Sequence, residues 1–257
     1  MPADWNASLY LKFEDQRTRP ARDLLAQVPR ATAGFVVDLG CGPGNSTELL
    51  AERFPDAQVL GLDTSPDMIA AARRRLPAAR FELADVSALE LPQPADVIFA
   101  NAVLQWVPDH AALLPRLMSL LAPGGVLAVQ MPDNLEEPAH VAMRETAMAG
   151  PWADKLAAAT GARTVLPDPT AYYDLLAPRA RSVDLWHTVY NHPLDGVPAI
   201  VEWLKSTGLR PFVDPLEGDE RAQFLEEYAA RLADFYLPRV DGKVLLAFPR
   251  FFMVAVK

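Results

Sequence analysis

The sequence predicts an α/β fold in which helices cover a mostly parallel sheet. Through residues 1–130, short apolar runs alternate with helical patterns, and this alternation is typical of a parallel sheet. A glycine-rich loop follows the first apolar run, at the edge of such a sheet where ligands usually bind. The second half carries longer helical patterns and two late strand patterns. These late strands predict an antiparallel strand at the edge of the sheet, and the helices between them predict cap insertions.

The first half supplies five expected strands with helices between them. The strands are expected at 35–39, 58–62, 80–83, 96–100 and 126–131. Helices are expected at 45–53, 66–75 and 109–121. Pro66 suits the first turn of the second helix, because its ring fixes a helical φ and its missing N–H is not needed there.

The second half predicts a helical cap on the same single domain, 1–257. Its helices are expected at 138–149, 152–159, 171–176, 197–206 and 219–236, and its strands at 181–190 and 243–256. Asp219 is the expected N-cap of the longest helix, and Pro249 predicts a bulge or break in the last strand. We expect an N-terminal lid at 1–30, a cofactor-binding core at 31–134, and cap segments at 135–165 and 196–240.

The charge balance excludes partners with dense negative charge. The chain has 24 Lys and Arg against 33 Asp and Glu, a formal net charge of −9, which argues against nucleic acid and anionic membranes. Its single cysteine, Cys41, excludes an internal disulfide and a multi-cysteine zinc site. No apolar run is long enough to span a bilayer, and no signal-peptide pattern is present. We therefore expect a cytoplasmic protein without a metal, whose oligomeric state the sequence leaves open.

The glycine-rich loop carries the first functional signal. Gly40, Gly42 and Gly44 occupy alternate positions, and Asp63 ends the second expected strand 19 residues after Gly44. Glycines let backbone approach a ligand closely, and an acid at that distance can accept hydrogen bonds from both ribose hydroxyls. The structural alternatives are a tight turn for the loop and a helix-capping role for Asp63 beside Thr64.

The spacing favours S-adenosylmethionine (SAM) over a dinucleotide. A dinucleotide loop reads G-x-G-x-x-G, whereas Asn45 occupies its third glycine position here. Asp38 precedes the loop, where it would repel a pyrophosphate but can pair with an ammonium group. Asp85 and Val86 follow the third strand, where the carboxylate and the amide can contact an adenine.

Together these residues resemble class I SAM-dependent methyltransferases, and more closely the trans-aconitate 2-methyltransferase family. The segments that carry the resemblance are 4–6, 8–11, 38–47, 99–110, 127–134, 207–211 and 245–250. It implies a Rossmann-like sheet and methyl transfer from SAM to a carboxylate of trans-aconitate, giving the monomethyl ester. The implied cofactor residues are Asp38, Gly40, Gly42, Gly44, Asn45, Asp63, Thr64, Met68, Asp85, Val86, Asn101 and Ala102.

The residues after Asn101 narrow the acceptor. Methyltransferases acting on DNA amino groups carry Pro-Pro-aromatic after this position, whereas this chain has Ala-Val-Leu, so nucleobase methylation is disfavoured. A carboxylate is already ionised at pH 7 and needs no general base. A tricarboxylate partner needs cationic groups, and arginine matches carboxylate geometry best. The candidate substrate-positioning residues are Tyr10, Arg19, Gln105, Trp106, Arg144, Tyr172 and Arg210.

Three other functions remain open at this point. The chain could methylate a different small molecule, because the fold and the SAM site do not set the acceptor. An NAD-linked oxidoreductase is disfavoured by the early third glycine and by Asp38. A SAM-binding protein without activity is disfavoured by the intact set of acidic residues.

Overall fold

A computed structural model describes residues 14–257 apart from Ser206. The chain forms two compact units, and each is described by itself. The sheet unit contains the described residues up to 132 together with 166–188 and 251–257, and the helical unit contains 133–165 and 189–250. Tyr10 and the first part of the expected lid lie outside the described residues.

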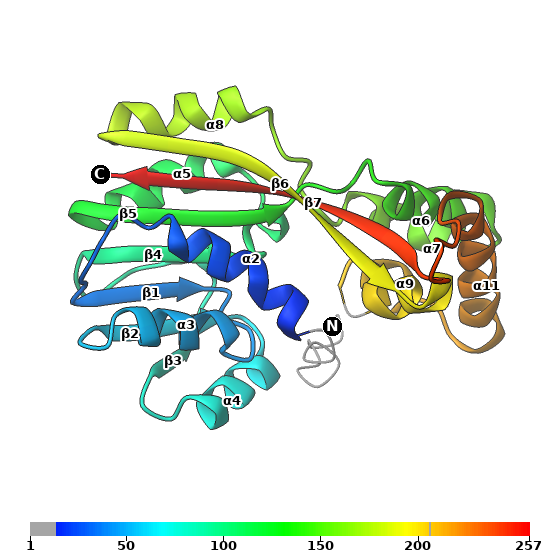
Figure 1. Ribbon diagram of the computed structural model, residues 1–257, viewed down its shortest axis with the longest axis horizontal. Helices are drawn as coiled ribbons and strands as arrows, with labels where there is room; N and C mark the ends of the chain where they lie inside the picture. The colour runs from blue at the N-terminus through cyan, green and yellow to red at the C-terminus, as the bar shows by residue number, and fades with distance from the viewer. Residues whose placement is uncertain (1–13, 206) are drawn as a thin grey trace. The chain divides into compact units, whose positions relative to one another are not determined.

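The described residues form a seven-stranded sheet in the order β3-β2-β1-β4-β5-β7-β6. The strands are β1 (Phe35–Leu39), β2 (Gln58–Asp63), β3 (Arg80–Leu83), β4 (Ala95–Asn101), β5 (Leu121–Pro132), β6 (Ser182–Leu194) and β7 (Val244–Val256). Strands β1 to β5 pair in parallel. β7 points the opposite way (Figure 1). The predicted mostly parallel sheet is confirmed, and its antiparallel strand lies between β5 and the outermost strand, β6.

The helices occur close to the expected places. In the sheet unit they are α2 (Glu14–Ala26), α3 (Asn45–Arg53), α4 (Pro66–Arg75), α5 (His110–Ser119) and α8 (Pro169–Leu176). In the helical unit they are α6 (Pro138–Ala149), α7 (Ala153–Leu156), α9 (Gly196–Lys205), α10 (Arg210–Val213) and α11 (Gly218–Phe235). Short 3-10 turns are η1 (Val86–Ala88), η2 (Leu104–Trp106), η3 (Ala157–Gly161) and η4 (Ala177–Arg179). None of the helices in the described residues is long and apolar enough to cross a membrane.

Three local expectations were wrong. Glu217, not Asp219, is the N-cap of α11 and makes no side-chain capping bond; Asp219 lies in the first turn, where its charge still suits the helix dipole. β7 continues through Pro249, whose carbonyl accepts from the Asp133 N–H at 3.0 Å. β5 begins at Leu121 rather than 126, because the chain pairs with β4 through a register shift there.

Helices cover both faces of the sheet, so its central strands are buried. All five residues of β1 are buried. Helices α5 and α8 pack against one face, where Val37, Ile98 and Leu127 belong to the main apolar core. Helix α2 packs against α3 and β5. Burial on both faces explains the nearly continuous apolar runs in the sequence.

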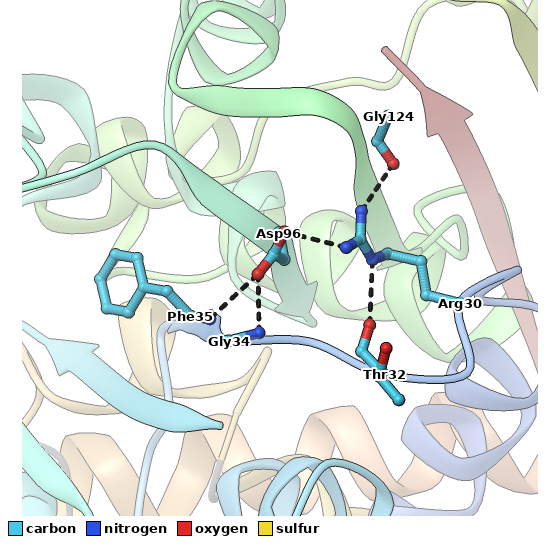
Figure 2. A network of polar contacts seen from close by, with 6 residues as sticks. All are labelled: Arg30, Thr32, Gly34, Phe35, Asp96 and Gly124. Atoms are coloured by element: carbon cyan, nitrogen blue, oxygen red, sulfur yellow. Dashed lines mark hydrogen bonds and ion pairs between the residues drawn. The ribbon is translucent and has the colours of Figure 1, made fainter. Parts of the chain in front are cut away.

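A polar network fixes the amino ends of β1 and β4 (Figure 2), whereas the glycine loop follows the carboxyl end of β1. The Asp96 carboxylate accepts from the Gly34 N–H at 2.7 Å and the Phe35 N–H at 3.1 Å. Arg30 donates to the same carboxylate at 2.9 Å and to the Gly124 carbonyl at 2.9 Å. Strands β1, β4 and β5 are thereby tied together, which fixes where their other ends present side chains.

The helical unit has a core of its own. Trp152 is fully buried against Phe224 of α11, with ring centroids 5.3 Å apart, and its indole N–H donates to the Thr146 carbonyl at 2.8 Å. The Tyr228 hydroxyl donates to the Ala139 carbonyl at 2.9 Å, which joins α11 to α6. Helices in both expected cap segments, 135–165 and 196–240, belong to this unit; their role as a cap stays a prediction.

Candidate cofactor site

The loop between β1 and α3 holds three glycines in left-handed backbone conformations. Gly40, Gly42 and Gly44 have φ values of 62°, 53° and 95°. A Cβ on Gly40 would lie 2.4 Å from a methyl group of Val103, whereas a Cβ on Gly42 would meet nothing within 4 Å. Gly40 therefore lets the loop pack against Val103, and Gly42 leaves open space beside its backbone.

Asp63, at the carboxyl end of β2, holds this loop. Its Oδ2 accepts from the Gly42 N–H and its Oδ1 from the Ser65 N–H, each at 2.9 Å. A carboxylate has about four acceptor sites, which is more than these two bonds use. The side-chain cap of α4 is Ser65, whose Oγ accepts from the Met68 N–H at 3.2 Å. Asp63 is thus not the side-chain cap of α4.

A cavity of about 270 Å³ lies beside the loop, where β1, β2 and β4 end. Ligands in open α/β sheets bind at this edge. The predicted cofactor residues that line it are Gly40, Gly42, Asp63, Thr64, Met68, Asp85, Val86, Asn101 and Ala102. The apolar side chains of Ala84, Val103 and Val107 also line the cavity, and they were not predicted from the sequence. The only feature of the sequence that pointed to them is that they lie next to predicted residues.

Asp85 enters the cavity wall at the start of η1. Its Oδ1 accepts from the backbone N–H of Ser87 at 2.8 Å and from the Ser87 hydroxyl at 2.7 Å. These bonds lower the pKa of Asp85 below its ordinary value, because they favour the charged form. The carboxylate is therefore ionised at neutral pH and fixed in place beside Val86.

Three predicted cofactor residues do not line the cavity. Asp38 is fully buried, and its Oδ2 accepts from the hydroxyls of Ser46 at 2.7 Å and Thr47 at 2.6 Å. Its Oδ1 is buried without a hydrogen-bond partner among the described residues. Gly44 is the N-cap residue of α3, and the Asn45 Nδ2 donates to Thr18 of α2 at 3.4 Å. These residues shape the loop, and their contact with a cofactor stays a prediction.

The burial of Asp38 predicts a measurable pH dependence of stability. Desolvation raises the pKa of Asp38 from 3.8 to about 7. Because the folded state then holds the proton more tightly than the unfolded state, this group costs stability as the pH rises from about 4 to 7. The change between pH 5 and 7 is on the order of 2 kcal/mol. Chemical denaturation of the wild type and Asp38→Asn should show the wild type losing stability relative to the variant over this range; parallel curves would contradict the shift.

A strained turn follows β4 at the cavity. Ala102 has a φ of 57°; its N–H donates to the Gln130 carbonyl at 2.8 Å, and its carbonyl accepts from Gln105 Nε2 at 2.7 Å. Gln105 is itself 3 % exposed and does not line the cavity. Its contribution in the described structure is to hold the turn that presents Asn101. The Asn101 Oδ1 is buried without a partner among the described residues, so it can accept a hydrogen bond from a ligand.

The predicted substrate residues of the sheet unit separate into different places. Trp106 lines the cofactor cavity. Arg19 lies exposed on α2, 3.9 Å from Asp23. Tyr172 is fully buried in the main core, and its hydroxyl lies 2.7 Å from His110 Nδ1. His110 Nε2 is 2.9 Å from the Leu104 carbonyl and must donate to it. In the neutral ring, Nδ1 then accepts from the tyrosine hydroxyl. The structure therefore places Tyr172 as a core residue and not in the cavity wall.

Two predicted arginines belong to the helical unit. Arg210, on α10, contacts Asp214 at 3.3 Å one turn later. Arg144, on α6, donates to the Leu135 carbonyl at 2.6 Å and lines a small cavity of this unit. Contact between either residue and a substrate stays a prediction.

Comparison with known structures supports the same fold. The YcgJ protein of Bacillus subtilis aligns with a TM-score of 0.58 at 13 % identity, over 94 % of this chain and 98 % of that chain. A phosphoethanolamine N-methyltransferase of Haemonchus contortus, solved with S-adenosyl-L-methionine, aligns with a TM-score of 0.55 at 16 % identity, over 92 % and 52 %. At these identities the likeness shows the fold alone, and the predicted Rossmann-like class I methyltransferase fold is confirmed.

Sequence comparison identifies the family. A methyltransferase domain family matches residues 36–125. Trans-aconitate 2-methyltransferases of Rhodopseudomonas palustris strain HaA2 and Afipia carboxidovorans are 60 % and 58 % identical, each over 99 % of this chain and 100 % of the relative. The relative from Methylobacterium radiotolerans is 58 % identical over 99 % of both chains. The chain therefore belongs to the trans-aconitate 2-methyltransferase family.

Proposed function

We propose that this chain transfers the methyl group of SAM to a carboxylate of trans-aconitate, giving the monomethyl ester and S-adenosylhomocysteine. The observation that carries the proposal is the cavity at the carboxyl ends of β1, β2 and β4, lined by Asp63, Asp85 and Asn101 beside the glycine loop. The name shared by relatives at 58–60 % identity supports the acceptor.

The lining of the cavity fits SAM in its parts. Asp63 offers two oxygens to ribose hydroxyls, and Asp85 offers one carboxylate to an adenine amino group. The unpartnered Asn101 Oδ1 accepts from a donor such as the ammonium of the methionine part. Gly42 leaves room for close approach, since a Cβ there would meet nothing within 4 Å. SAM would supply the transferred methyl group, which is attached to a positively charged sulfur.

The cavity offers no residue suited to remove a proton from an acceptor. Among its described lining residues, the titratable side chains are Asp63 and Asp85, and both carboxylates already accept backbone N–H bonds. This suits a carboxylate acceptor, which is ionised at neutral pH without a base. The chain then contributes alignment of the reactants and exclusion of water by apolar walls such as Val103 and Trp106.

An acceptor comparison tests this function. The full chain is incubated with SAM labelled in the methyl group and with trans-aconitate, cis-aconitate, citrate or isocitrate, and the ester is identified by mass spectrometry. We expect efficient ester formation with trans-aconitate and much less with the other three acids. Transfer to a different small molecule with none to trans-aconitate would establish the alternative acceptor class instead.

We also propose that the enzyme acts in the cytoplasm. Its single cysteine, Cys41, is a free and buried thiol, which is usual where thiols are kept reduced. Cell fractionation with an antibody against the chain tests the location, and recovery outside the cytoplasmic fraction would contradict it.

A further inference from the structure

The helical unit contains a small cavity of about 20 Å³ that is lined by two arginines. Arg144 comes from α6 and Arg163 follows η3, and the loop at Gly208 closes another side. His140 also lines it and is 5 % exposed. A cavity of this size takes one small group and not a whole tricarboxylate.

Hydrogen bonding around Arg163 leaves buried donors without acceptors. Arg163 Nη1 donates to Asn134 Oδ1 at 2.8 Å and lies 3.4 Å from His140 Nε2. If this ring nitrogen accepts from the guanidinium, His140 carries its proton on Nδ1. Both His140 Nδ1 and Asn134 Nδ2 are buried without a partner among the described residues. Both orphaned groups then donate, so a group that only accepts hydrogen bonds would satisfy them.

The local charge also favours an anion. Burial, Arg163 and Arg144 together lower the pKa of His140 to about 3, so the ring stays neutral. Burial lowers the pKa of Arg163 to about 10. The negative charge of Asp133 raises this pKa, and the positive charge of Arg144 lowers it further. Asp133 is exposed, and Glu136, which contacts Arg144 at 3.2 Å, is 90 % exposed. Water screens these two acids more than it screens Arg163, which is half-buried.

Gly208 keeps the space around His140 open. A Cβ on Gly208 would lie 3.0 Å from His140 Nε2, which is tighter than an ordinary contact. The segment 207–211 is one of those that carry the family resemblance, and it contains the candidate substrate residue Arg210. In the structure Arg210 contacts Asp214, while Gly208 and Pro211 line the cavity.

We propose that Arg163 and Arg144, with His140 and Asn134, form a carboxylate-binding site through which the helical unit recognises the acceptor. A carboxylate accepts hydrogen bonds only and fits the planar donors of guanidinium groups. The inference rests on the proposed function, because that function makes the ligand a tricarboxylate. It assigns acceptor recognition to Arg163, which the sequence did not single out.

The test compares Arg163→Gln and Arg144→Gln with Arg239→Gln. Arg239 is an exposed arginine of the same unit that does not line the cavity, so it controls for the change in charge. Loss of a charged hydrogen-bonding partner should raise the KM for trans-aconitate about 10- to 100-fold in the first two variants. The KM for SAM should stay within about 2-fold in all three, since the cofactor cavity is made by the sheet unit.

A binding measurement separates recognition from folding and from turnover. Titration calorimetry follows binding of tricarballylate, a saturated tricarboxylate, to each variant in the presence of S-adenosylhomocysteine. We expect weaker binding for Arg163→Gln and Arg144→Gln only. Arg144→Gln leaves the hydrogen bond between Arg163 and Asn134 in place, so this variant is expected to fold. A folded Arg144→Gln variant with wild-type KM for trans-aconitate and wild-type binding of tricarballylate would overturn the inference. If the wild-type chain methylates another acceptor and does not methylate trans-aconitate, the proposed function is refuted instead.

Discussion

Replacing Gly40 by alanine is expected to lower the affinity for SAM by about 100-fold or more and to destabilise the sheet unit. The new Cβ would lie 2.4 Å from a Val103 methyl group and 2.5 Å from the Val103 Cβ, so backbone must move on one side. Overpacking typically costs about 1–3 kcal/mol, and a left-handed alanine adds about 1–2 kcal/mol. Gly40 and Val103 both line the cofactor cavity, so this movement deforms the binding site. Calorimetric titration with SAM and the thermal midpoint Tm measure the two effects.

Two further variants separate crowding from backbone strain. In Gly42→Ala the new Cβ lies in open space, whereas the φ of Gly42, 53°, is similar to that of Gly40. This variant should therefore lose only the stability and SAM affinity that backbone strain costs. Adding Val103→Gly to Gly40→Ala should recover much of the lost stability, whereas Val103→Ala should not, because the Val103 Cβ is itself too close. Wild-type SAM affinity and Tm in Gly40→Ala would show that the loop does not depend on this contact.

Asp63→Ala is expected to lower SAM affinity by about 100-fold or more while the strands still form. The substitution removes the oxygens that accept from the Gly42 and Ser65 N–H groups at 2.9 Å, and with them the proposed contacts to the ribose. Hydrogen bonds to charged groups contribute about 1.5–3 kcal/mol each, so losing two gives an effect of this size or larger. Titration with SAM and circular dichroism of each variant provide the measurement.

Asp67→Asn is the matched control for this prediction. Asp67 is an exposed acid in the first turn of α4, and its replacement removes one negative charge without removing a residue that lines the cavity. Asp63→Asn keeps one oxygen and should fall between the wild type and Asp63→Ala. If Asp63→Ala binds SAM as tightly as Asp67→Asn, the carboxylate has no part in cofactor binding.

The residues that line the cavity could largely be predicted from the sequence, because parallel strands end at one edge. Asp63, Asp85 and Asn101 each follow a strand pattern, and the carboxyl ends of β2, β3 and β4 meet at that edge. Local spacing therefore determined their neighbourhood. The same logic identified Gly42 but gave no reason for Gly40 in particular, because Val103 lies 63 residues later in the chain.

The partners of the predicted acceptor residues could not be derived from the sequence in this way, because long side chains take whichever partner the folded chain brings near. Tyr172 looked like a hydroxyl donor for substrate, yet His110 takes its hydrogen bond at 2.7 Å. Arg210 was one of the candidate substrate-positioning residues, and in the structure it contacts Asp214 one turn later. Arg163 had no signal in the sequence, and it became a candidate only because folding placed it beside His140 and Asn134.

The sequence by itself determined the alternation of strands and helices, the SAM-type loop and the strand-end acids, because periodicity, glycine spacing and strand order are local properties. Only the tertiary structure decided that Gly40 must accommodate Val103, that Tyr172 belongs to the core, and that Arg144 and Arg163 share a cavity. Each of these depends on atoms far apart in the chain, whose approach is set by packing and by the need of buried polar groups for partners.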